Sequence, residues 1–371
     1  MDLIFKMDNT TKIKILYTIP NFDTAGSGKV VYDLVKGLDK EKFEVEVACS
    51  NDRGALFNEV EKLGIPIHIL ETTTKYRPYF TLIPRLKPIR DFFKKHKYDI
   101  IHSWHWSSDW TEVLAARWAG AKWIYTKKAM SWGNRHWKIR SYFANFIITI
   151  NDEMHSYFPN KKSQRLISLG IDTAFYSPKL FPKKATENEI LNIITVANLV
   201  PVKGVEVLIN AIKLLDDEKI RLTILGDNTN EYGDYLATLS KNLDLEEQVR
   251  FLGRKTDVRP YIAAADLYVI PTLNEGRKEG MPMALVEAIS MAIPVLGSDI
   301  SGINFVLRDF KNLLFEAGNE TQLAKKILEI KLLSTVERGK LGSDLRNYVT
   351  ENFNYEKFIA DHQRLYVELL K

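Results

Sequence analysis

The sequence has a single cysteine and no long hydrophobic run, and both absences narrow the classes of protein to which it can belong. With Cys49 alone, an internal disulfide is excluded and a cluster of thiolate metal ligands is implausible. No apolar stretch approaches the roughly 20 residues that span a bilayer, and the apolar residues 3–5 are too few for the core of a signal peptide. We therefore expect a cytoplasmic protein that is soluble or peripheral on the inner face of the cytoplasmic membrane.

Length and charge indicate more than one domain. A chain of 371 residues is too long for one ordinary hydrophobic core. Its 45% apolar and 27% charged residues are typical of a soluble globular protein. The net charge of +5 is uneven, because residues 1–180 carry +9 and the remainder carries −4. The basic character therefore belongs to the first half.

Short apolar runs alternate with helical patterns along most of the chain, and the alternation restarts after a polar segment. In the first half we expect strands at 13–19, 43–49, 65–70, 99–104, 122–126, 146–150 and 165–169, and helices at 29–38, 83–97 and 108–119. The polar segment 177–188, with two prolines, is the best linker. In the second half we expect strands at 190–197, 221–225, 249–252, 267–270 and 294–296, and helices at 203–215, 232–243, 258–264, 283–291, 322–331, 336–349 and 355–370. The pattern predicts an α/β protein with two Rossmann-like domains, at 1–180 and 186–352, and a ligand site beyond the strand ends in the cleft between them.

The most informative motif is the segment 271–302, in which a strand is followed by a polar loop and a helix that begins near Pro282. The amides of Gly280 and Met281 are then expected at a helix N-terminus, where an anion is stabilised. Glu279 and Glu287 lie about 12 Å apart along the helix axis, so they cannot share one proton but can reach two ends of an elongated ligand. The alternative is that Glu279 is a first-turn acid and Glu287 a structural glutamate.

Two further segments join a strand to a helix. In residues 196–204, Lys203 opens the predicted helix, where a positive charge is unfavourable unless an anion binds beside it. The alternative is a solvated lysine. In residues 26–28, Gly26, Ser27 and Gly28 form a predicted loop whose glycines allow the backbone to approach a ligand, although a plain turn explains them equally.

These three segments together resemble the retaining glycosyltransferases of family four, the group 1 enzymes of bacterial surface-polysaccharide synthesis, which have the GT-B fold of two Rossmann-like domains facing each other across a cleft. The paired glutamates of 279–299 carry most of the resemblance, with lesser similarity at 170–178, 224–227 and 249–253. The resemblance implies that the last helix, 353–371, packs back on the first domain.

The resemblance also implies roles for individual residues. Glu279 is expected to bind the donor sugar and Glu287 the ribose, while Lys203 neutralises the leaving diphosphate. Residues expected to bind the donor are Gly28, Asn198, Lys203, Arg254, Glu279, Gly280, Met281, Pro282, Met283, Leu285 and Glu287. Residues expected in the acceptor loop are Gly26, Ser27, Gly28 and Lys128. The catalytic residues are expected to be Glu279, Lys203 and His102.

The sequence departs from the family pattern at two places. Asn198 occupies the position usually held by a diphosphate-binding arginine and carries no charge, so Lys128 or Arg254 would have to compensate. Many relatives have a histidine after the strand at 122–126, where this chain has Lys127 and Lys128. His102 and His105 are therefore the alternative cleft histidines, although aromatic packing explains His105 among its neighbouring tryptophans slightly better.

The reaction implied is transfer of a hexose-type sugar from a UDP- or GDP-sugar to a saccharide or lipid-linked acceptor, with retention of configuration. No metal and no cofactor beyond the nucleotide-sugar substrate are expected, because a helix N-terminus and Lys203 stand in for a metal. The alternatives are a nucleotide-sugar epimerase of the same fold and a non-catalytic nucleotide-sugar-binding protein.

Residues 75–97 carry eight lysines and arginines against one acid, Asp91, with aromatic residues between them. Such a surface can rest on anionic lipid headgroups, so we expect peripheral membrane contact here; the alternative is an amphipathic helix with a solvated basic face. A second basic run, 122–140, contains no acid and could meet an acceptor phosphate. No recognition motif accompanies these patches, so nucleic acid is not an expected partner.

Overall fold

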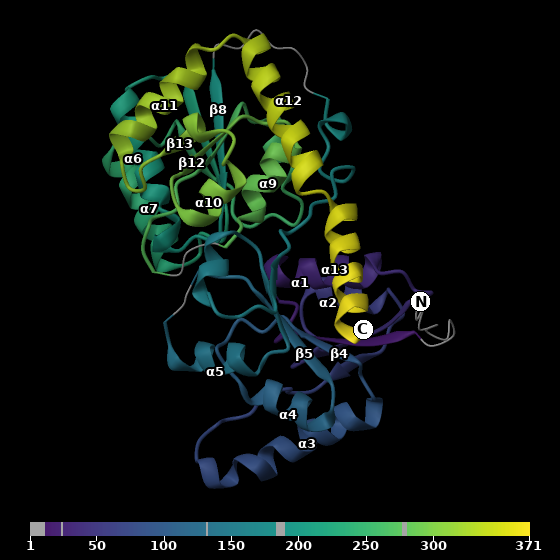
Figure 1. The fold of residues 1–371 in the computed structure, drawn as a ribbon. Helices are drawn as coiled ribbons and strands as arrows, with labels where there is room; N and C mark the ends of the chain where they lie inside the picture. The colour runs from purple at the N-terminus through teal and green to yellow at the C-terminus, as the bar shows by residue number, and fades with distance from the viewer. Residues whose placement is uncertain (1–11, 24, 131–132, 183–189, 277–279) are drawn as a thin grey trace. The chain divides into compact units, whose positions relative to one another are not determined.

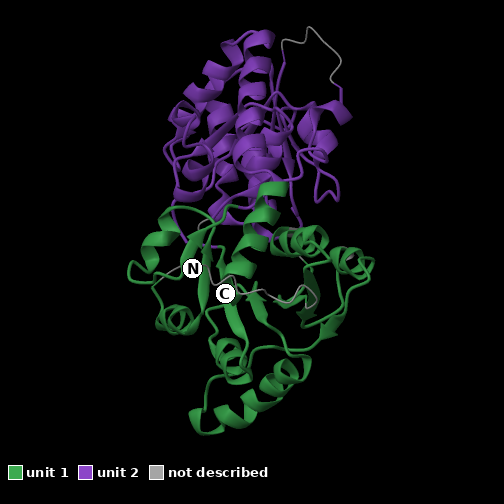
Figure 2. Cartoon of the chain, turned by 45° about the vertical axis from the view of Figure 1, so that its right-hand side comes forward, with its two compact units in different colours: residues 1–128, 132–168, 356–371 green, residues 129–131, 169–355 purple. Residues whose placement is uncertain are grey.

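The structure is a computed structural model that describes residues 12–23, 25–130, 133–182, 190–276 and 280–371. The chain forms two compact units, shown in green and purple in Figure 2. Unit 1 comprises residues 1–128, 132–168 and 356–371, and unit 2 comprises residues 129–131 and 169–355. The chain therefore passes from the first unit to the second and returns to the first.

Unit 1 is built on a parallel sheet of seven strands, in the order β3-β2-β1-β4-β5-β6-β7. Its strands are β1 (Ile13–Thr18), β2 (Phe43–Cys49), β3 (Ile67–Ile69), β4 (Ile100–Ser103), β5 (Lys122–Lys127), β6 (Phe146–Thr149) and β7 (Gln164–Leu166). Its helices are α1 (Ala25–Gly37), α2 (Ala55–Glu61), α3 (Leu82–His96), α4 (Thr111–Ala119) and α5 (Arg135–Phe143), with short 3-10 turns η1 (Tyr79–Thr81) and η2 (Glu153–Tyr157). Every residue of β4 is buried, as expected for a central strand covered on both faces.

The last helix of the chain, α13 (Tyr355–Leu370), belongs to unit 1 from Glu356 onward. Its Tyr366 is fully buried and shares a hydrogen bond of 2.8 Å with the hydroxyl of Tyr17 on β1. The Tyr366 hydroxyl also lies 2.7 Å from Nδ1 of His102 on β4. The helix is thus attached to the two central strands by buried polar contacts as well as by apolar packing.

Unit 2 holds a second parallel sheet, of six strands in the order β10-β9-β8-β11-β12-β13. Its strands are β8 (Leu191–Val196), β9 (Ile220–Leu225), β10 (Val249–Phe251), β11 (Leu267–Ile270), β12 (Val295–Ser298) and β13 (Leu314–Phe315). Its helices are α6 (Val205–Leu215), α7 (Glu231–Asn242), α8 (Arg259–Ala264), α9 (Met283–Ser290), α10 (Ser301–Val306), α11 (Glu320–Leu332) and α12 (Thr335–Asn352). Three 3-10 turns, η3 (Pro178–Leu180), η4 (Pro201–Lys203) and η5 (Lys311–Leu313), complete the unit. Helices flank this sheet on both sides, with α6 and α7 on one and α9 and α12 on the other (Figure 1).

The α/β class and the two Rossmann-like sheets predicted from the sequence are confirmed. The sequence pattern missed α2, α5 and α10, which have only six to nine residues each. In α5 the apolar periodicity is weak, and the helix start is fixed instead by the Asn134 side chain, which accepts hydrogen bonds from the amides of His136 and Trp137.

Within the described residues, no helix is both long enough and apolar enough to span a lipid bilayer. The segment 177–188 predicted as a linker begins with η3, and its residues 183–188 lie outside the part of the chain that the structure describes.

Candidate functional site

The residues predicted to bind the donor follow neighbouring strands of the unit 2 sheet. Asn198 and Lys203 follow β8, Arg254 follows β10, and the segment from Gly280 follows β11. Because β10, β9, β8 and β11 are parallel and adjacent, these segments emerge from the same edge of the sheet. This carboxyl edge is where ligands bind in open α/β sheets.

The loop after β8 packs tightly on the loop after β11. Gly204 has a φ of 61°, and a Cβ atom added to it would lie 2.3 Å from the carbonyl oxygen of Pro271. The amide of Leu273 donates a hydrogen bond of 2.8 Å to the carbonyl of Val202. Only glycine allows this approach, and the approach holds Lys203 next to the chain that leads to α9.

Lys203 does not lie inside the helix that the sequence predicted from 203. It ends the 3-10 turn η4, and α6 begins two residues later at Val205. The amide of Val205 donates to the Tyr232 hydroxyl at 3.1 Å, and that hydroxyl donates to the Glu206 carboxylate. A first-turn amide of α6 therefore already has a partner within unit 2, and the role of Lys203 toward a diphosphate stays a prediction.

Helix α9 begins where the sequence predicted, with Pro282 as its N-cap residue and Met283 as its first helical residue. Among the described residues, no side-chain oxygen accepts a hydrogen bond from the amides at this helix end. Such an N-terminus favours a negatively charged group beside it. Glu287 is half-buried on the same helix. Glu279 falls outside the described residues, so its position opposite Glu287 stays a prediction.

Two other predicted donor residues of this segment, Leu285 and Met281, have buried side chains. Leu285 is fully buried, and Met281 is 4% exposed. The side chain of Leu285 therefore packs in the core beneath α9, and its expected place near the ribose stays a prediction. Gly280 and Pro282 are also buried, so this turn offers backbone groups rather than side chains.

Asn198 and Arg254 are exposed at the same edge. Gly226, which follows β9, contacts both loops: a Cβ on it would lie 2.1 Å from the carbonyl oxygen of Ala197, and its amide donates a hydrogen bond of 3.2 Å to the carbonyl of Gly253. Arg254 already has an acidic neighbour: hydrogen bonds from Thr229, and then the charge of Arg254, lower the pKa of Asp227.

In unit 1, the predicted glycine loop is the first turn of a helix. Gly26, Ser27 and Gly28 lie inside α1, so the expected loop conformation is wrong. A Cβ on Gly28 would lie 2.8 Å from Cδ2 of Leu56, whereas one on Gly26 would meet nothing within 4 Å. Close packing of α1 on α2 therefore explains the glycine at position 28.

The structure brings two of the predicted acceptor-loop residues together. The Lys128 ammonium, just after β5, donates a hydrogen bond of 2.9 Å to the hydroxyl of Ser27 in α1. It also donates to the carbonyl of Trp104 and lies over the rings of Trp104 and Trp106, 5.4 and 5.7 Å from their centroids. A positive charge is thus fixed beside the first turn of α1, where it adds to the favourable environment for an anion.

His102, predicted as a catalytic residue, lies in the interior of unit 1. Its side chain is fully buried, Nε2 lies 2.9 Å from the Thr126 hydroxyl, and Nδ1 lies 2.7 Å from the Tyr366 hydroxyl. Burial lowers its pKa well below the usual value. All these partners belong to unit 1, so His102 packs in the core of that unit, and its catalytic role stays a prediction.

His105 is also buried and lies in a polar network that the sequence did not reveal. Its Nε2 lies 3.1 Å from the Thr72 hydroxyl and 3.7 Å from the carboxylate of Glu112. Glu112 also accepts hydrogen bonds from Ser103 at 2.6 Å and from the Trp123 indole at 3.1 Å. Thr72 lies 40 residues before Glu112, and Ser103 and Trp123 come from the neighbouring strands β4 and β5, so no motif spacing indicated the network.

Two family models match the chain in succession. The model of glycosyltransferase family 4 matches residues 24–175, and the model of group 1 glycosyl transferases matches residues 177–351. The chain belongs to the group 1 glycosyltransferases of family 4. The two matched ranges are separated by a single residue, so the family resemblance of this group 1 glycosyltransferase extends through both units.

Relatives of this group 1 glycosyltransferase include an enzyme named for polysaccharide synthesis and others named for different glycosyl transfers. The capsular polysaccharide biosynthesis glycosyltransferase CapH of Staphylococcus aureus is 27% identical over 82% of this chain and 86% of its own length. A galactosyltransferase of Escherichia coli, named for transfer from UDP-galactose to N-acetylglucosamine-diphosphoundecaprenol, is 21% identical over 97% of this chain and 98% of its own. The N-acetylglucosaminyl malate synthase of Bacillus anthracis is 27% identical over 60% of this chain, and the match spans 58% of that relative.

Solved structures share the fold of this group 1 glycosyltransferase. A glycosyltransferase from Rickettsia africae superposes with a TM-score of 0.84 at 19% identity, covering 97% of this chain and 99% of its own. HepE of Anabaena, in complex with UDP and glucose, gives 0.79 at 19% identity, covering 95% and 99%. These likenesses establish the GT-B architecture, and the relatives' names place the family in polysaccharide biosynthesis.

Proposed function

We propose that this glycosyltransferase moves a hexose-type sugar from a UDP- or GDP-sugar to a saccharide or lipid-linked acceptor, with retention of configuration, during synthesis of a surface polysaccharide or glycolipid. The observation that carries the proposal is the close packing of the β8 and β11 loops in unit 2. This packing holds Lys203 beside the chain that leads to α9 and Glu287. A cation, a helix N-terminus and a carboxylate then line one strand edge, as an elongated diphosphate sugar requires.

Each group has a separate role in this proposal. The uncapped N-terminus of α9 and the Lys203 ammonium stabilise the negative charge that develops on the departing diphosphate. Glu287 accepts hydrogen bonds from the ribose hydroxyls, and Glu279 accepts them from the sugar. The acceptor hydroxyl attacks from the face that the diphosphate leaves. Positioning and preorganised charge supply most of the rate without a protein nucleophile or a metal.

Asn198 leaves the diphosphate with one fewer cation than the family usually provides. Its amide can donate a hydrogen bond but cannot neutralise charge. Arg254 lies exposed at the same edge of unit 2 and is the compensating cation that we propose. In unit 1, Lys128 beside Ser27 is proposed to meet the phosphate of an acceptor or donor.

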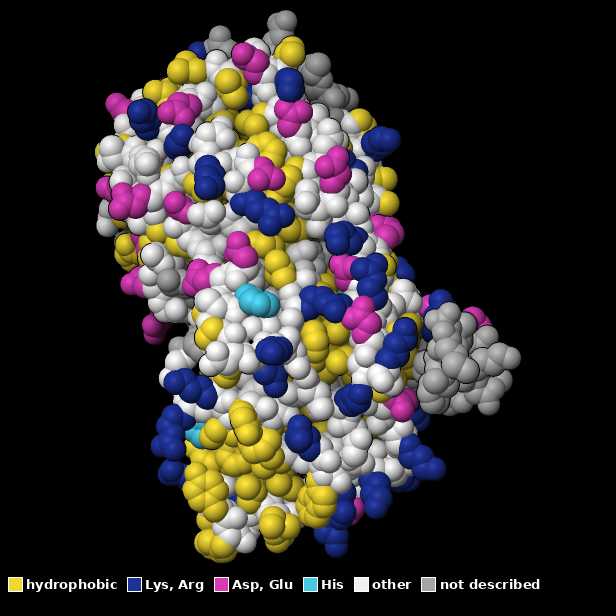
Figure 3. Space-filling view, in the orientation of Figure 1, with side chains coloured by type: hydrophobic (Ala, Val, Ile, Leu, Met, Phe, Trp, Pro, Cys, Tyr) yellow, Lys and Arg dark blue, Asp and Glu magenta, His cyan; other side chains and the backbone are white. Residues whose placement is uncertain are grey.

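A lipid-linked acceptor would require the enzyme to reach a membrane surface, and the α3 region of unit 1 has the chemistry for it. Three apolar side chains at the start of this region, Tyr79, Phe80 and Ile83, are 60%, 85% and 67% exposed. Figure 3 shows hydrophobic side chains gathered over α3 with lysines and arginines near them. Helix α3 itself packs into unit 1 through Leu86, Ile89 and Phe93. We therefore propose peripheral contact with anionic lipid through residues 75–97.

Product analysis tests the proposed reaction. The protein is incubated with labelled UDP- and GDP-sugars and a membrane lipid extract, and lipid and nucleotide fractions are separated. We expect label in a glycolipid, with the anomeric configuration of the donor. An interconverted nucleotide-sugar would support an epimerase instead, and binding without turnover would support a non-catalytic binding protein.

A further inference from the structure

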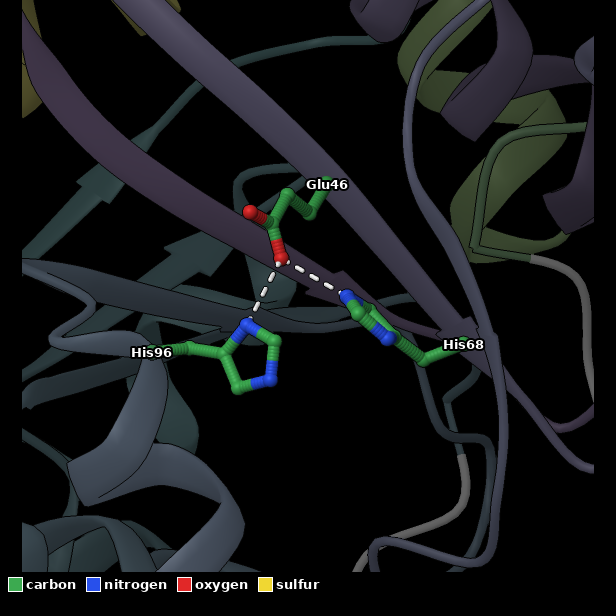
Figure 4. Close-up of side chains that lie close together, drawn as sticks. All are labelled: Glu46, His68 and His96. Carbon is green, nitrogen blue, oxygen red and sulfur yellow. Dashed lines mark hydrogen bonds and ion pairs between the residues drawn. The ribbon is translucent and has the colours of Figure 1, made fainter.

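Three potential metal ligands from three separate elements of unit 1 converge near one edge of its sheet. Glu46 lies on β2, His68 lies on the neighbouring strand β3, and His96 is the last residue of α3. Nε2 of His68 lies 2.7 Å and Nδ1 of His96 lies 3.5 Å from the same carboxylate oxygen, Oε2 of Glu46 (Figure 4). One ligand atom from each residue lies within 4.8 Å of the other two.

Two imidazoles and a carboxylate are the donor set of many three-residue zinc sites, in which a water takes the fourth position. A tetrahedral ion with bonds of about 2.0–2.1 Å separates its ligand atoms by about 3.4 Å. The observed separations bracket that value, so small side-chain shifts would admit an ion. The carboxylate is buried, whereas the side chains of His68 and His96 are 21% and 23% exposed, which leaves a path for the ion to enter.

The groups around the three residues hold them in place. Lys14 contacts the other carboxylate oxygen of Glu46, Oε1, at 2.8 Å, and it also pairs with Glu44 at 3.0 Å. Tyr98 donates a hydrogen bond to Oε2 of Glu46, and its ring stacks on His96 with 5.6 Å between centroids. Ligands oriented by such neighbouring contacts are typical of metal sites.

Each histidine turns a ring nitrogen toward the Glu46 carboxylate. Nδ1 of His96 lies 3.5 Å and Nε2 of His68 lies 2.7 Å from Oε2 of Glu46. A neutral imidazole has a lone pair on one ring nitrogen, so the tautomer with the proton on the other nitrogen can bind a metal.

We propose that Glu46, His68 and His96 form a binding site for a zinc-type divalent cation that fastens the end of α3 to the β2–β3 edge of unit 1. The site contains none of the residues assigned to donor or acceptor, and it goes beyond the proposed transferase function. Bound there, the ion would join the end of α3 to two strands and would keep one coordination position for water.

Zinc titration of the full-length protein tests the site. The protein is stripped with EDTA, dialysed and titrated calorimetrically with ZnCl₂, and bound zinc is then counted by mass spectrometry. We expect one ion per chain and a melting temperature that rises with zinc, since an ion that binds only the folded state stabilises it. His68→Gln and His96→Gln should each weaken binding by about tenfold or more. His155→Gln, which changes an exposed histidine in η2 of the same unit, should bind zinc as the wild type does.

Two outcomes would overturn the proposal. One is that the wild type shows no saturable zinc binding. The other is that His68→Gln and His96→Gln both bind zinc with wild-type affinity, which would show that the ion binds elsewhere. If these variants do not fold without zinc, X-ray absorption of the wild-type zinc complex decides instead. We expect only nitrogen and oxygen neighbours with the outer-shell scattering of two imidazoles. A sulfur neighbour, which Cys49 would supply, contradicts the site.

Discussion

Gly204 lies so close to Pro271 that a single methyl group between them would collide with the Pro271 carbonyl, at 2.3 Å. This contact joins the segment that follows β8 to the segment that follows β11, two neighbouring strands of unit 2. It places Lys203 and the approach to α9 on one small surface. The candidate donor site therefore depends on a backbone-to-backbone approach as well as on charged side chains.

Gly204→Ala should disrupt this approach. The added Cβ incurs the cost of a positive φ, about 1–2 kcal/mol, and in addition the clash with Pro271. Gly64→Ala is the matched control, because Gly64 also has a positive φ, of 69°, with nothing within 4 Å of an added Cβ. We expect a larger fall in melting temperature for Gly204→Ala and a loss of nucleotide-sugar binding in that variant alone. Equal melting temperatures and equal binding would show that the contact does not organise the site.

Lys203→Gln should slow transfer more than it weakens donor binding. The ammonium is proposed to stabilise charge that appears on the diphosphate only as the bond breaks, and removal of such a group costs about 100-fold or more in kcat. Lys213→Gln, an exposed lysine on α6, provides the control. Initial rates at saturating donor measure the effect. A kcat for Lys203→Gln equal to that of Lys213→Gln would remove Lys203 from the mechanism.

The double variant Phe80→Ser, Ile83→Ser should lose affinity for anionic vesicles. These two side chains are the most exposed apolar groups of the α3 region, and their burial in the headgroup layer would favour binding. Leu332→Ser with Val336→Ser changes two side chains of similar exposure, 76% and 81%, in unit 2 and should leave flotation unchanged. Flotation on vesicles with and without anionic lipid measures both. Wild-type flotation that is independent of anionic lipid would exclude the proposed contact.

The stability of unit 1 should fall as the pH decreases from about 7 to about 5. Burial lowers the pKa of His362, which is fully buried on α13 beside His102, to about 4. The pKa of an unfolded histidine is about 6.5, so between these values the unfolded chain binds more protons and acid favours unfolding. The contribution is fully present above about pH 6.5 and is lost as the pH falls toward 4. We measure the melting temperature of each protein at pH 5 and at pH 7.5. The drop in melting temperature from pH 7.5 to pH 5 should therefore be larger for the wild type than for His362→Leu. His155→Leu should keep the wild-type difference.

The sequence predicted much of the architecture because buried parallel strands are continuous apolar runs. The runs at β8, β9 and β11 lie within about a residue of their predicted bounds at most ends. The pattern failed where tertiary contacts decide the conformation. Gly26 to Gly28 have the composition of a loop, but α1 extends through them because Gly28 fits against α2.

The candidate site could be predicted only where its residues are contiguous. The segment from Gly280 to Glu287 was visible as a strand-loop-helix motif, whereas its packing against Gly204 depends on strand order. The burial of His102 could not be predicted for the same reason, since its partners Thr126 and Tyr366 come from another strand and from the last helix. Glu46, His68 and His96 have no motif spacing at all, and only the fold brings them together.

The most direct test of the account is the affinity for a nucleotide-sugar donor in the two glutamate variants. A thermal-shift panel first identifies the donor that stabilises the protein, and calorimetry then measures its dissociation constant. Glu279→Ala and Glu287→Ala should each weaken binding by about tenfold or more, as loss of a hydrogen bond to a charged group does. Glu246→Ala, an exposed acid of unit 2, should bind as the wild type does. Wild-type affinity and turnover in both Glu279→Ala and Glu287→Ala would contradict the assignment of the donor site.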